Sequence, residues 1–205
     1  MNPVIETIKS RRSVRSYKQT PVPKELIEAI IDAGNWAPTG NNRQPWRFVV
    51  VEKGDFRERL IHVAAPIQRR VIDSWMSTED GFLREYFVDF FPKCLGWPRQ
   101  SYEDTMRQAR DLEDGVYWGA PVAIFVIGTS GRESALVCEN MMLAAQSLGL
   151  GTCIVGFGTL VTEDEEVVEA FRLQGNEKIH DCVVVGYPEI VPGPPNKRDP
   201  EVIWI

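Results

Sequence analysis

Residues 37–51, APTGNNRQPWRFVVV, join a polar, turn-forming run to a run of bulky apolar side chains. The second half, WRFVVV, is rich in β-branched and aromatic residues, which favour a buried strand. Just before this segment, apolar residues recur at helical spacing between Pro23 and Gly34, and a glycine followed by a proline is a common helix end. We therefore expect a helix, a polar loop and a central strand in that order.

The same rhythm continues along the chain. Further strand-like runs stand at residues 122–127, 151–157 and 182–185. An apolar stripe over residues 133–149 predicts a long core helix, and the capping-box spacing of Thr162 and Glu165 predicts the start of another. Strands and helices that alternate in this way indicate a mixed α/β domain.

Composition restricts the class of protein. The 205 residues, 43% hydrophobic and 25% charged, fit one domain over residues 1–205. A net charge of -6 argues against nonspecific nucleic-acid binding, which needs many Lys and Arg side chains. No apolar run could span a membrane and no secretory signal is recognisable, so we expect a cytoplasmic protein without membrane contact. The four cysteines form no CxxC pair, so reduced buried thiols are expected and no metal site is predicted.

A basic cluster follows the first expected helix, for which Asn2 and Pro3 provide an N-cap and a first residue. Residues 11–15, RRSVR, place three guanidinium groups around one hydroxyl. Each guanidinium is a planar fork of donors that matches phosphate oxygens. A solvated basic turn explains the same residues, so a phosphate site is one of two interpretations.

The polar half of residues 37–51 is the second candidate site. Its proline, glycine and asparagines are explained by turn chemistry alone. The accumulation of Asn41, Asn42 and Gln44 is not, because their amides offer both donors and acceptors, as the polar edge of a heterocycle needs. A ring-binding loop is therefore a second interpretation.

Two other patterns do not support a site. Residues 149–156, GLGTCIVG, resemble a dinucleotide fingerprint, but Ile154 stands where that motif needs its third glycine. His180 and Cys182 could form a base and a thiol, yet no orienting partner is visible, so ordinary packing is favoured.

Four segments, SRRSVRSY, APTGNNRQPWRFVVV, GLGTCIVGF and NKRDP, occur in an order that resembles the nitroreductase family of flavoproteins. The resemblance spans nearly the whole chain. It implies an α+β fold in which a mainly antiparallel central sheet is flanked by helices. It also implies an intertwined homodimer with FMN bound at the subunit interface.

The same resemblance implies roles for the basic cluster. Arg11 and Arg12 would hold the FMN phosphate and the ribityl end. Ser13 and Arg15 would contact the ribityl chain and the pyrimidine edge of the flavin, with Arg15 near N1 and O2. Arg198, in NKRDP, would close on the phosphate.

The other implied contacts come from the loop and from the third segment. Side chains of the loop would reach the flavin of the partner subunit: Pro38, Thr39, Asn42 and Gln44. The backbone amides of Val155 and Gly156 would approach the ring near N5 and O4.

The resemblance further implies a ping-pong reaction in which NADH or NADPH reduces FMN, which then reduces a small acceptor such as a nitroaromatic or a quinone. No catalytic side chain is named, because the flavin carries the chemistry. Two alternatives stay open: a flavin-consuming or dehalogenating enzyme of the same fold, and a non-catalytic FMN-binding protein.

Two segments depart from the regular order of elements. Residues 75–118 form an aromatic-rich insertion, expected to be either a helical lid over the acceptor or scaffold. The aromatics that would line the acceptor pocket are Phe82, Tyr86, Phe87, Phe90, Phe91 and Trp97. Residues 191–205 are expected to form a C-terminal arm whose residues 202–205 pair with the partner's sheet edge.

Overall fold

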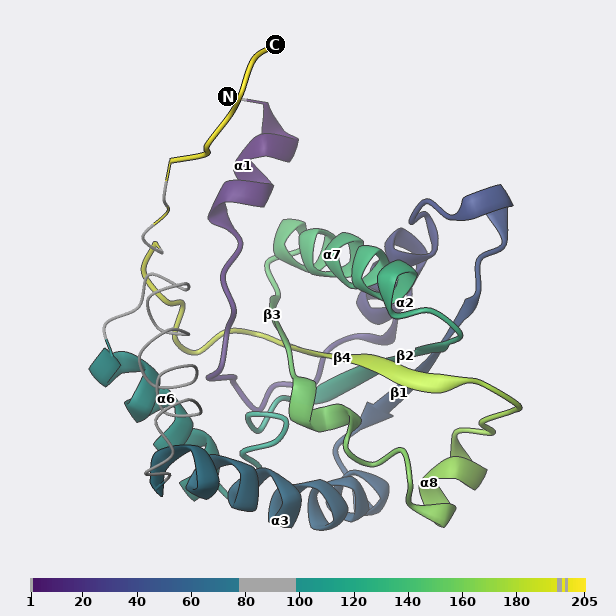
Figure 1. Ribbon diagram of the computed structural model, residues 1–205, viewed down its shortest axis with the longest axis vertical. Coiled ribbons are helices and arrows are strands. Elements are labelled where there is room, and N and C mark those ends of the chain that lie inside the picture. The colour runs from purple at the N-terminus through teal and green to yellow at the C-terminus, as the bar shows by residue number, and fades with distance from the viewer. Residues whose placement is uncertain (1, 78–98, 195–196, 198) are drawn as a thin grey trace.

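The computed structural model describes residues 2–77, 99–194, 197 and 199–205 (Figure 1). Its sheet has the order β1-β2-β4-β3, and every neighbouring pair is antiparallel. The strands are β1 (Trp46–Glu52), β2 (Val122–Gly128), β3 (Gly151–Ile154) and β4 (Lys178–Gly186). The expected antiparallel α+β fold is confirmed. The mixed α/β class is corrected, because alternation along a chain does not fix strand direction.

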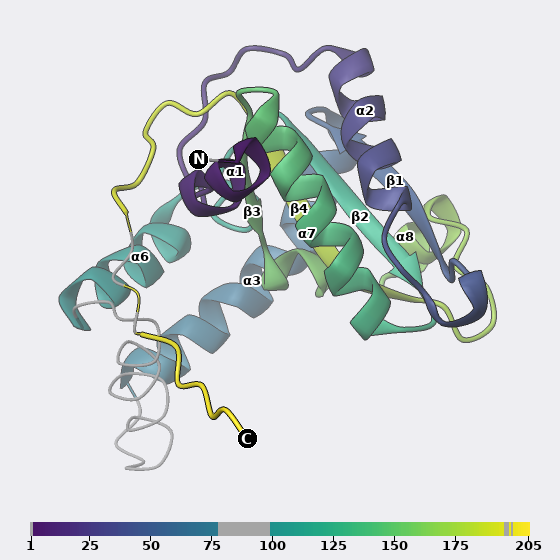
Figure 2. The ribbon, with the colours of Figure 1, turned by 90° about the horizontal axis from the view of Figure 1, so that it is seen from above.

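Helices cover both faces of the sheet. They are α1 (Pro3–Ser10), α2 (Lys24–Asn35), α3 (Asp55–Ser77), α6 (Arg99–Asp111), α7 (Gly131–Ser147) and α8 (Glu165–Ala170), with short 3-10 turns η1 (Gly40–Asn42) and η3 (Gly156–Thr159). In Figures 1 and 2, α2 and α7 lie on one face, and α3 and α8 on the other. The strand expected at residues 151–157 ends at Ile154, because the chain then turns into η3.

The central strand β2 joins the two layers. All seven of its residues are buried, and its side chains alternate between the two hydrophobic clusters. Phe125 packs on the α3 side, with its ring centroid 4.9 Å from that of Phe171. Ile124 packs on the α7 side with Met141, whose side chain would lie 2.6 Å from a Cβ added at Gly34 of α2. The helix pair α2–α7 therefore needs a glycine at this crossing.

Two helix starts test the expected caps. Asn2 caps α1 as expected, because its side chain accepts a hydrogen bond from the Val4 amide at 2.9 Å. The cap of α8 is a correction: Asp164, not Thr162, accepts from the Val167 amide, at 3.1 Å. The Thr162 hydroxyl instead donates to the Thr159 carbonyl, so it is used by the preceding turn.

The insertion at residues 75–118 is described only in part. Its first residues are the end of α3, its later part contains α6, and the two helices pack on each other. Phe82, Tyr86, Phe87, Phe90, Phe91 and Trp97 lie outside the described residues. The expectation that they form a lid therefore stays a prediction.

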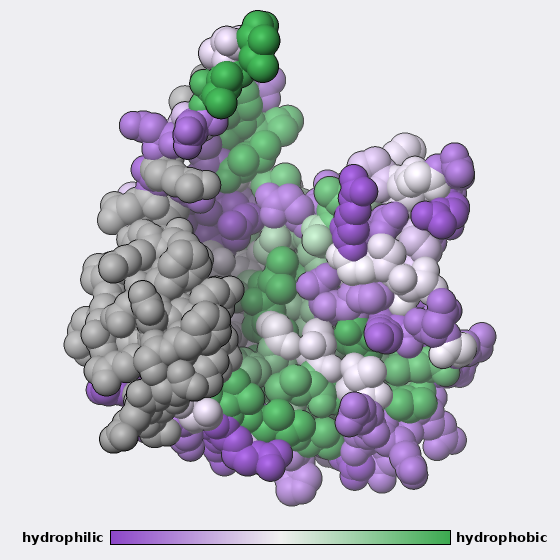
Figure 3. Space-filling view, in the orientation of Figure 1, coloured by the Kyte–Doolittle hydropathy of each residue, from purple (hydrophilic) through white to green (hydrophobic). Residues whose placement is uncertain are grey.

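The C-terminal arm leaves the sheet after β4 and ends well away from α1 (Figure 2). Residues 202–205 form no strand within the chain and are exposed, with Ile203 at 81% and Trp204 at 91%. In Figure 3 the tip of the molecule at this place is apolar. Among the described helices, none is both long and apolar enough to cross a bilayer.

Candidate functional site

The basic segment, residues 11–15, leaves α1 and runs beside β3 (Figures 1 and 2). Ser13 and Thr152 form an isolated parallel bridge, and the Val14 amide donates to the Thr152 carbonyl at 2.9 Å. Val14 is buried against Gly151, where an added Cβ would lie 2.7 Å from a Val14 methyl group. Backbone pairing and this close approach fix the segment on the sheet.

Arg11 carries an unused donor. Its Nη1 is buried and has no hydrogen-bond partner among the described residues. A buried donor without a partner loses the hydrogen bonds it made to water, and the cost is larger for a charged group. A phosphate oxygen at this position would remove that cost. The side chain therefore fits the phosphate group of the expected cofactor.

Arg12 uses most of its donors within the chain. Its Nε donates to the Gly193 carbonyl at 3.2 Å, and its Nη1 donates to the carbonyls of Lys9 and Arg11 at 2.8 and 2.7 Å. These bonds join the end of α1 to the start of the C-terminal arm. Arg12 thus holds the arm beside the basic segment, and a phosphate contact by Arg12 stays a prediction. Arg198 lies outside the described residues.

Arg15 lies at the other end of the basic segment. Its Nη1 donates to the Ser13 carbonyl at 3.3 Å, and its guanidinium carbon lies 5.7 Å from the centroid of the Trp118 ring. A cation over an aromatic face is attracted by the negative face of the ring. This contact orients Arg15 toward the turn that follows α6.

Cys153 of β3 lies near several residues of the basic segment. Burial raises the pKa of the Cys153 thiol, while the charges of Arg15 and Arg11 and a hydrogen bond with Ser13 oppose that rise. The fold therefore brings these three predicted site residues around one point of β3. The thiol is buried and free, as are those of Cys138 and Cys182, which confirms the expected reduced thiols at these positions.

The turn after β3 contains Val155 and Gly156, whose backbone amides were both expected to approach the flavin ring. The structure favours Gly156. The Val155 amide donates to the Cys182 carbonyl at 2.9 Å, so the sheet already uses the donor expected to face the flavin ring. Gly156 is exposed, and a Cβ added there would meet no atom within 4 Å. The geometry therefore leaves Gly156 as the position at which a ring could approach the backbone.

The amide loop, residues 38–44, has an unusual backbone. Asn41, Asn42 and Gln44 have φ angles of 56°, 54° and 47°. The left-handed region costs a residue with a side chain about 1–2 kcal/mol. Gln44 stabilises the loop, since its side-chain amide donates to the side-chain Oδ1 of Asn42 at 2.9 Å and its backbone amide donates to the Thr39 hydroxyl at 3.3 Å. Pro38, Asn42 and Gln44 are nonetheless exposed.

One chain does not bring the two candidate segments together. Figures 1 and 2 place the amide loop beyond one end of α7 and α2, while the basic segment and α1 lie at the other side of the molecule. The Arg43 guanidinium and the Glu133 carboxylate, 3.9 Å apart, link the loop to the start of α7 instead. The loop and the basic segment therefore belong to different surfaces of the chain.

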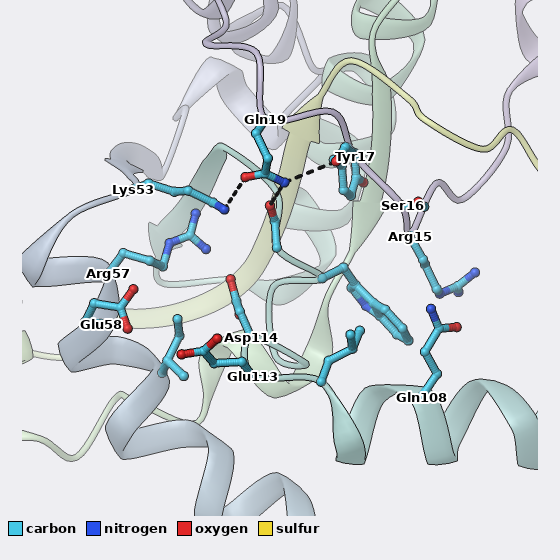
Figure 4. A pocket seen from close by; sticks show the side chains of 14 residues that line it. Arg15, Ser16, Tyr17, Gln19, Lys53, Arg57, Glu58, Gln108, Glu113 and Asp114 are labelled. Atoms are coloured by element: carbon cyan, nitrogen blue, oxygen red, sulfur yellow. Dashed lines mark hydrogen bonds between the residues drawn. The ribbon is translucent and has the colours of Figure 1, made fainter.

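A pocket that the sequence did not predict borders Arg15 (Figure 4). This cavity of about 410 Å³ lies between the start of α3, the turn at residues 112–119 and residues 15–19. It contains a fully buried arginine, Arg57. The sequence contains one signal that could have identified Arg57. Its spacing places it on the same helical stripe as Leu60 and Ala64, and an arginine within an apolar stripe is unusual.

The histidine and thiol pair does not form a site. The ring Nε2 of His180 lies 3.1 Å from the Gly128 carbonyl oxygen, and Cys182 is buried in the α3-side cluster. Burial raises the pKa of the Cys182 thiol to well above its ordinary value. Ordinary packing, the favoured interpretation, is confirmed.

Comparison with known proteins gives consistent results. A sequence profile described as the Nitroreductase family matches residues 8–187. An NADH dehydrogenase/NAD(P)H nitroreductase of Methanothermobacter thermautotrophicus is 27% identical over 98% of this chain and 86% of its own length. A nitrobenzene nitroreductase of Ectopseudomonas oleovorans is 29% identical over 76% of this chain and 74% of its own. The crystal structure of a Bacteroides fragilis nitroreductase with bound FMN covers 100% of both chains, with a TM-score of 0.67 and 25% identity.

Proposed function

The chain belongs to the nitroreductase family, and from that premise we propose that it binds FMN and transfers a hydride from NADH or NADPH to an electron-poor acceptor such as a nitroaromatic or a quinone. The single observation that carries the proposal is the buried Nη1 of Arg11, which has no hydrogen-bond partner in the described part of the chain. It lies on the segment that the family pattern assigns to the cofactor phosphate. A flavoprotein structure and nitroreductase names among the relatives support the choice of cofactor and reaction class.

The basic segment would provide the first part of the cofactor site. Arg11 would donate to the phosphate, and each charge-assisted hydrogen bond of this kind contributes about 1.5–3 kcal/mol. Arg15 would place a positive charge at the pyrimidine edge, because Trp118 and the Ser13 carbonyl fix its guanidinium. Bound FMN would supply the two-electron chemistry, so no side-chain nucleophile is required.

A second copy of the chain would provide the remaining part. Asn42 and Gln44 are exposed and distant from the basic segment of their own chain, so their amides suit a flavin held by another subunit. The site is therefore proposed to form only in a homodimer.

The assembly is supported by apolar surface on two segments. Val4, Ile5 and Ile8 are exposed on α1, and residues 202–205 are exposed in the arm. β1 is an edge strand of the sheet, and an edge strand can pair with an extended segment from another chain. We infer that residues 202–205 of one subunit add to the partner's sheet edge at β1.

Two alternatives share this cofactor site. A flavin-consuming or dehalogenating enzyme would use the same basic segment with a different acceptor, and a non-catalytic FMN-binding protein would use it without turnover. The cytoplasmic location expected from the sequence also stays a prediction.

Anaerobic stopped-flow mixing of the FMN-loaded protein with NADH and with NADPH tests the proposal. Bleaching of the flavin absorbance by either donor, followed by its return on addition of nitrobenzene or a quinone, is the expected result. Protein that stays colourless after incubation with FMN contradicts the cofactor assignment. Flavin that no donor reduces favours the binding protein, and reduced flavin that only oxygen or a haloaromatic reoxidises favours the alternative enzymes.

A further inference from the structure

The pocket beside Arg15 contains a charged group in an unusual state. The Arg57 side chain is 1% exposed although it comes from the start of α3. Its Nη2 donates to the Val51 carbonyl at 3.3 Å, and its guanidinium carbon lies 4.3 Å from the centroid of the Tyr117 ring. Tyr117 therefore supports the cation from one face, and Val51 satisfies one of its nitrogens.

The other two nitrogens of Arg57 have no such support. Its Nε and Nη1 are buried and lack hydrogen-bond partners among the described residues. No carboxylate of the described chain lies within ion-pair distance of this guanidinium, whereas neighbouring Arg59 pairs with Asp164 and Glu166 at 2.7 and 3.1 Å. Burying an unpaired charge is costly, so the fold holds this guanidinium in a state that an anion would stabilise.

Lys53 adds a second cation on the same side of the pocket. Figure 4 shows its ammonium group beside the Arg57 guanidinium, with Gln19 above both. The ammonium donates to the Gln19 side-chain oxygen, and the Gln19 amide donates to the carbonyls of Tyr17 and Gly119 at 3.2 and 3.4 Å. Lys53 is an exposed residue, and this hydrogen bond holds its ammonium group at the pocket.

The wall of the cavity also carries carboxylates, which limit the charge of a ligand. Glu58, Glu113 and Asp114 also border the cavity, and Figure 4 shows them below the two cations. Burial raises the pKa of Asp114, although the Tyr117 amide and the cations at Arg57 and Lys53 counter the rise. A dianionic phosphate would be repelled by this wall more strongly than a monoanionic carboxylate.

The remaining wall suits a ring. Ile61, Leu112 and Trp118 border the cavity together with the two cations. Its volume of about 410 Å³ lies within the roughly 300–1,000 Å³ range of small-molecule sites. Arg15, the residue expected at the flavin edge, forms part of the same wall. The pocket thus adjoins the proposed cofactor site.

We propose that Arg57 and Lys53 bind the carboxylate of a small aromatic acceptor, so that this enzyme prefers acceptors that carry a carboxylate beside the reducible group. That the bound molecule is an electron acceptor rests on the proposed function. The anion subsite itself depends only on the pocket. Arg57 would provide the buried contact and Lys53 the exposed one. Trp118 and Leu112 would contact the ring.

Calorimetric titration of the FMN-loaded protein with benzoate tests the subsite without turnover. Benzoate is expected to bind, and Arg57→Met or Lys53→Met is expected to weaken it about tenfold or more, the loss of one charge-assisted hydrogen bond. Arg59→Met, on the same helix but outside the pocket, is the matched control and should leave benzoate affinity unaltered. If Arg57→Met does not fold, Arg57→Lys and Lys53→Met carry the test.

A kinetic comparison tests the acceptor preference. The ratio of kcat/KM for 4-nitrobenzoate to that for nitrobenzene should fall about tenfold in Lys53→Met and stay constant in Arg59→Met. Benzoate binding that neither pocket variant weakens overturns the subsite. Inorganic phosphate or NADPH binding that depends on Arg57 while benzoate binding does not would reassign the pocket to a phosphate and overturn the carboxylate.

A wrong proposed function and a wrong anion subsite would give different experimental results. If no nitro compound is reduced but benzoate binding depends on Arg57, the proposed function is wrong and the anion subsite stands. If nitrobenzene is reduced and benzoate binding is indifferent to both variants, the proposed function stands and the subsite is wrong.

Discussion

The basic segment and the amide loop are both predicted to contact FMN, but they differ in how the fold holds them. Residues 11–15 are paired with β3 and packed through Val14, yet Arg11 keeps a buried donor that finds no partner in residues 2–77, 99–194, 197 and 199–205. The amide loop projects from the chain, has left-handed residues, and is held largely by its own hydrogen bonds. One segment is fixed but chemically incomplete, and the other is polar but exposed. This difference fits the proposal that each chain would provide two unlike halves of a site.

Among the changes proposed, removal of residues 202–205 of the arm should have the largest effect on FMN binding. A chain that ends at Glu201 loses the exposed apolar residues 202–205, so we expect a monomer in sedimentation velocity. Without the partner's loop, FMN affinity should fall about a hundredfold, as expected for the loss of several hydrogen bonds of about 1 kcal/mol each. Circular dichroism should show an intact fold. A truncated monomer that binds FMN as tightly as the full chain would remove the need for a second subunit.

Arg11→Ala tests the fixed half. The loss of one charge-assisted bond should lower FMN affinity by about ten- to a hundredfold, or about 1.5–3 kcal/mol, in a fluorescence titration. Folding should not suffer, since the variant also removes a buried donor that no described residue satisfies. Lys9→Ala, an exposed charge on the adjacent α1, is the matched control and should bind FMN normally. An unaltered titration curve for Arg11→Ala contradicts the phosphate assignment.

Gly151→Ala tests how the fixed half is positioned. The added Cβ would lie 2.7–3.0 Å from atoms of Val14, so the segment must shift away from β3. Overpacking of this kind costs about 1–3 kcal/mol, and we expect a lower free energy of unfolding together with weaker FMN binding. The double variant Gly151→Ala, Val14→Ala removes the two Val14 methyl groups, at 2.7 and 3.0 Å, and keeps only the Cβ contact at 2.9 Å, so it should recover part of the FMN affinity. If the single variant lowers stability alone, the Val14 contact is packing without influence on the site.

Asn42→Ala combined with Gln44→Ala tests the exposed half. Two neutral hydrogen bonds contribute about 0.5–1.5 kcal/mol each, so FMN affinity should fall by about five- to a hundredfold while the dimer persists. Sedimentation and FMN titration on the same sample separate the two properties. A dimer with unaltered FMN affinity would show that the amides serve only the loop.

The sequence predicted the elements better than their arrangement. The run of β-branched and aromatic residues at 122–127 identified β2 as a central strand, and Asn2 identified the start of α1, because both signals are local. The antiparallel order depends on contacts between distant strands, and Asp164 takes part in a contact with a distant helix besides its local capping bond. This contact is the ion pair of the Asp164 carboxylate with Arg59 of α3.

For the candidate site, too, the sequence predicted residue types better than their tertiary contacts. Residue type alone selected Arg11, Ser13, Arg15 and the amide loop, because donors for a phosphate and for a heterocycle are recognisable in a sequence. It could not show that the sheet uses the Val155 amide, since that bond joins distant segments. It also missed Arg57, whose burial becomes visible only when α3 packs on Val51 and Tyr117.

The central claim, that one site takes the basic segment from one chain and the amide loop from the other, has a direct test in mixed dimers. Chains carrying Arg11→Ala are reassociated with chains carrying Asn42→Ala and Gln44→Ala, and the heterodimer is isolated through two different affinity tags. In the heterodimer one site combines both defects and the other has none, so about half of the sites should recover the FMN affinity of the unaltered protein. A heterodimer in which every site stays weak would place both segments in the site of a single chain and contradict the account.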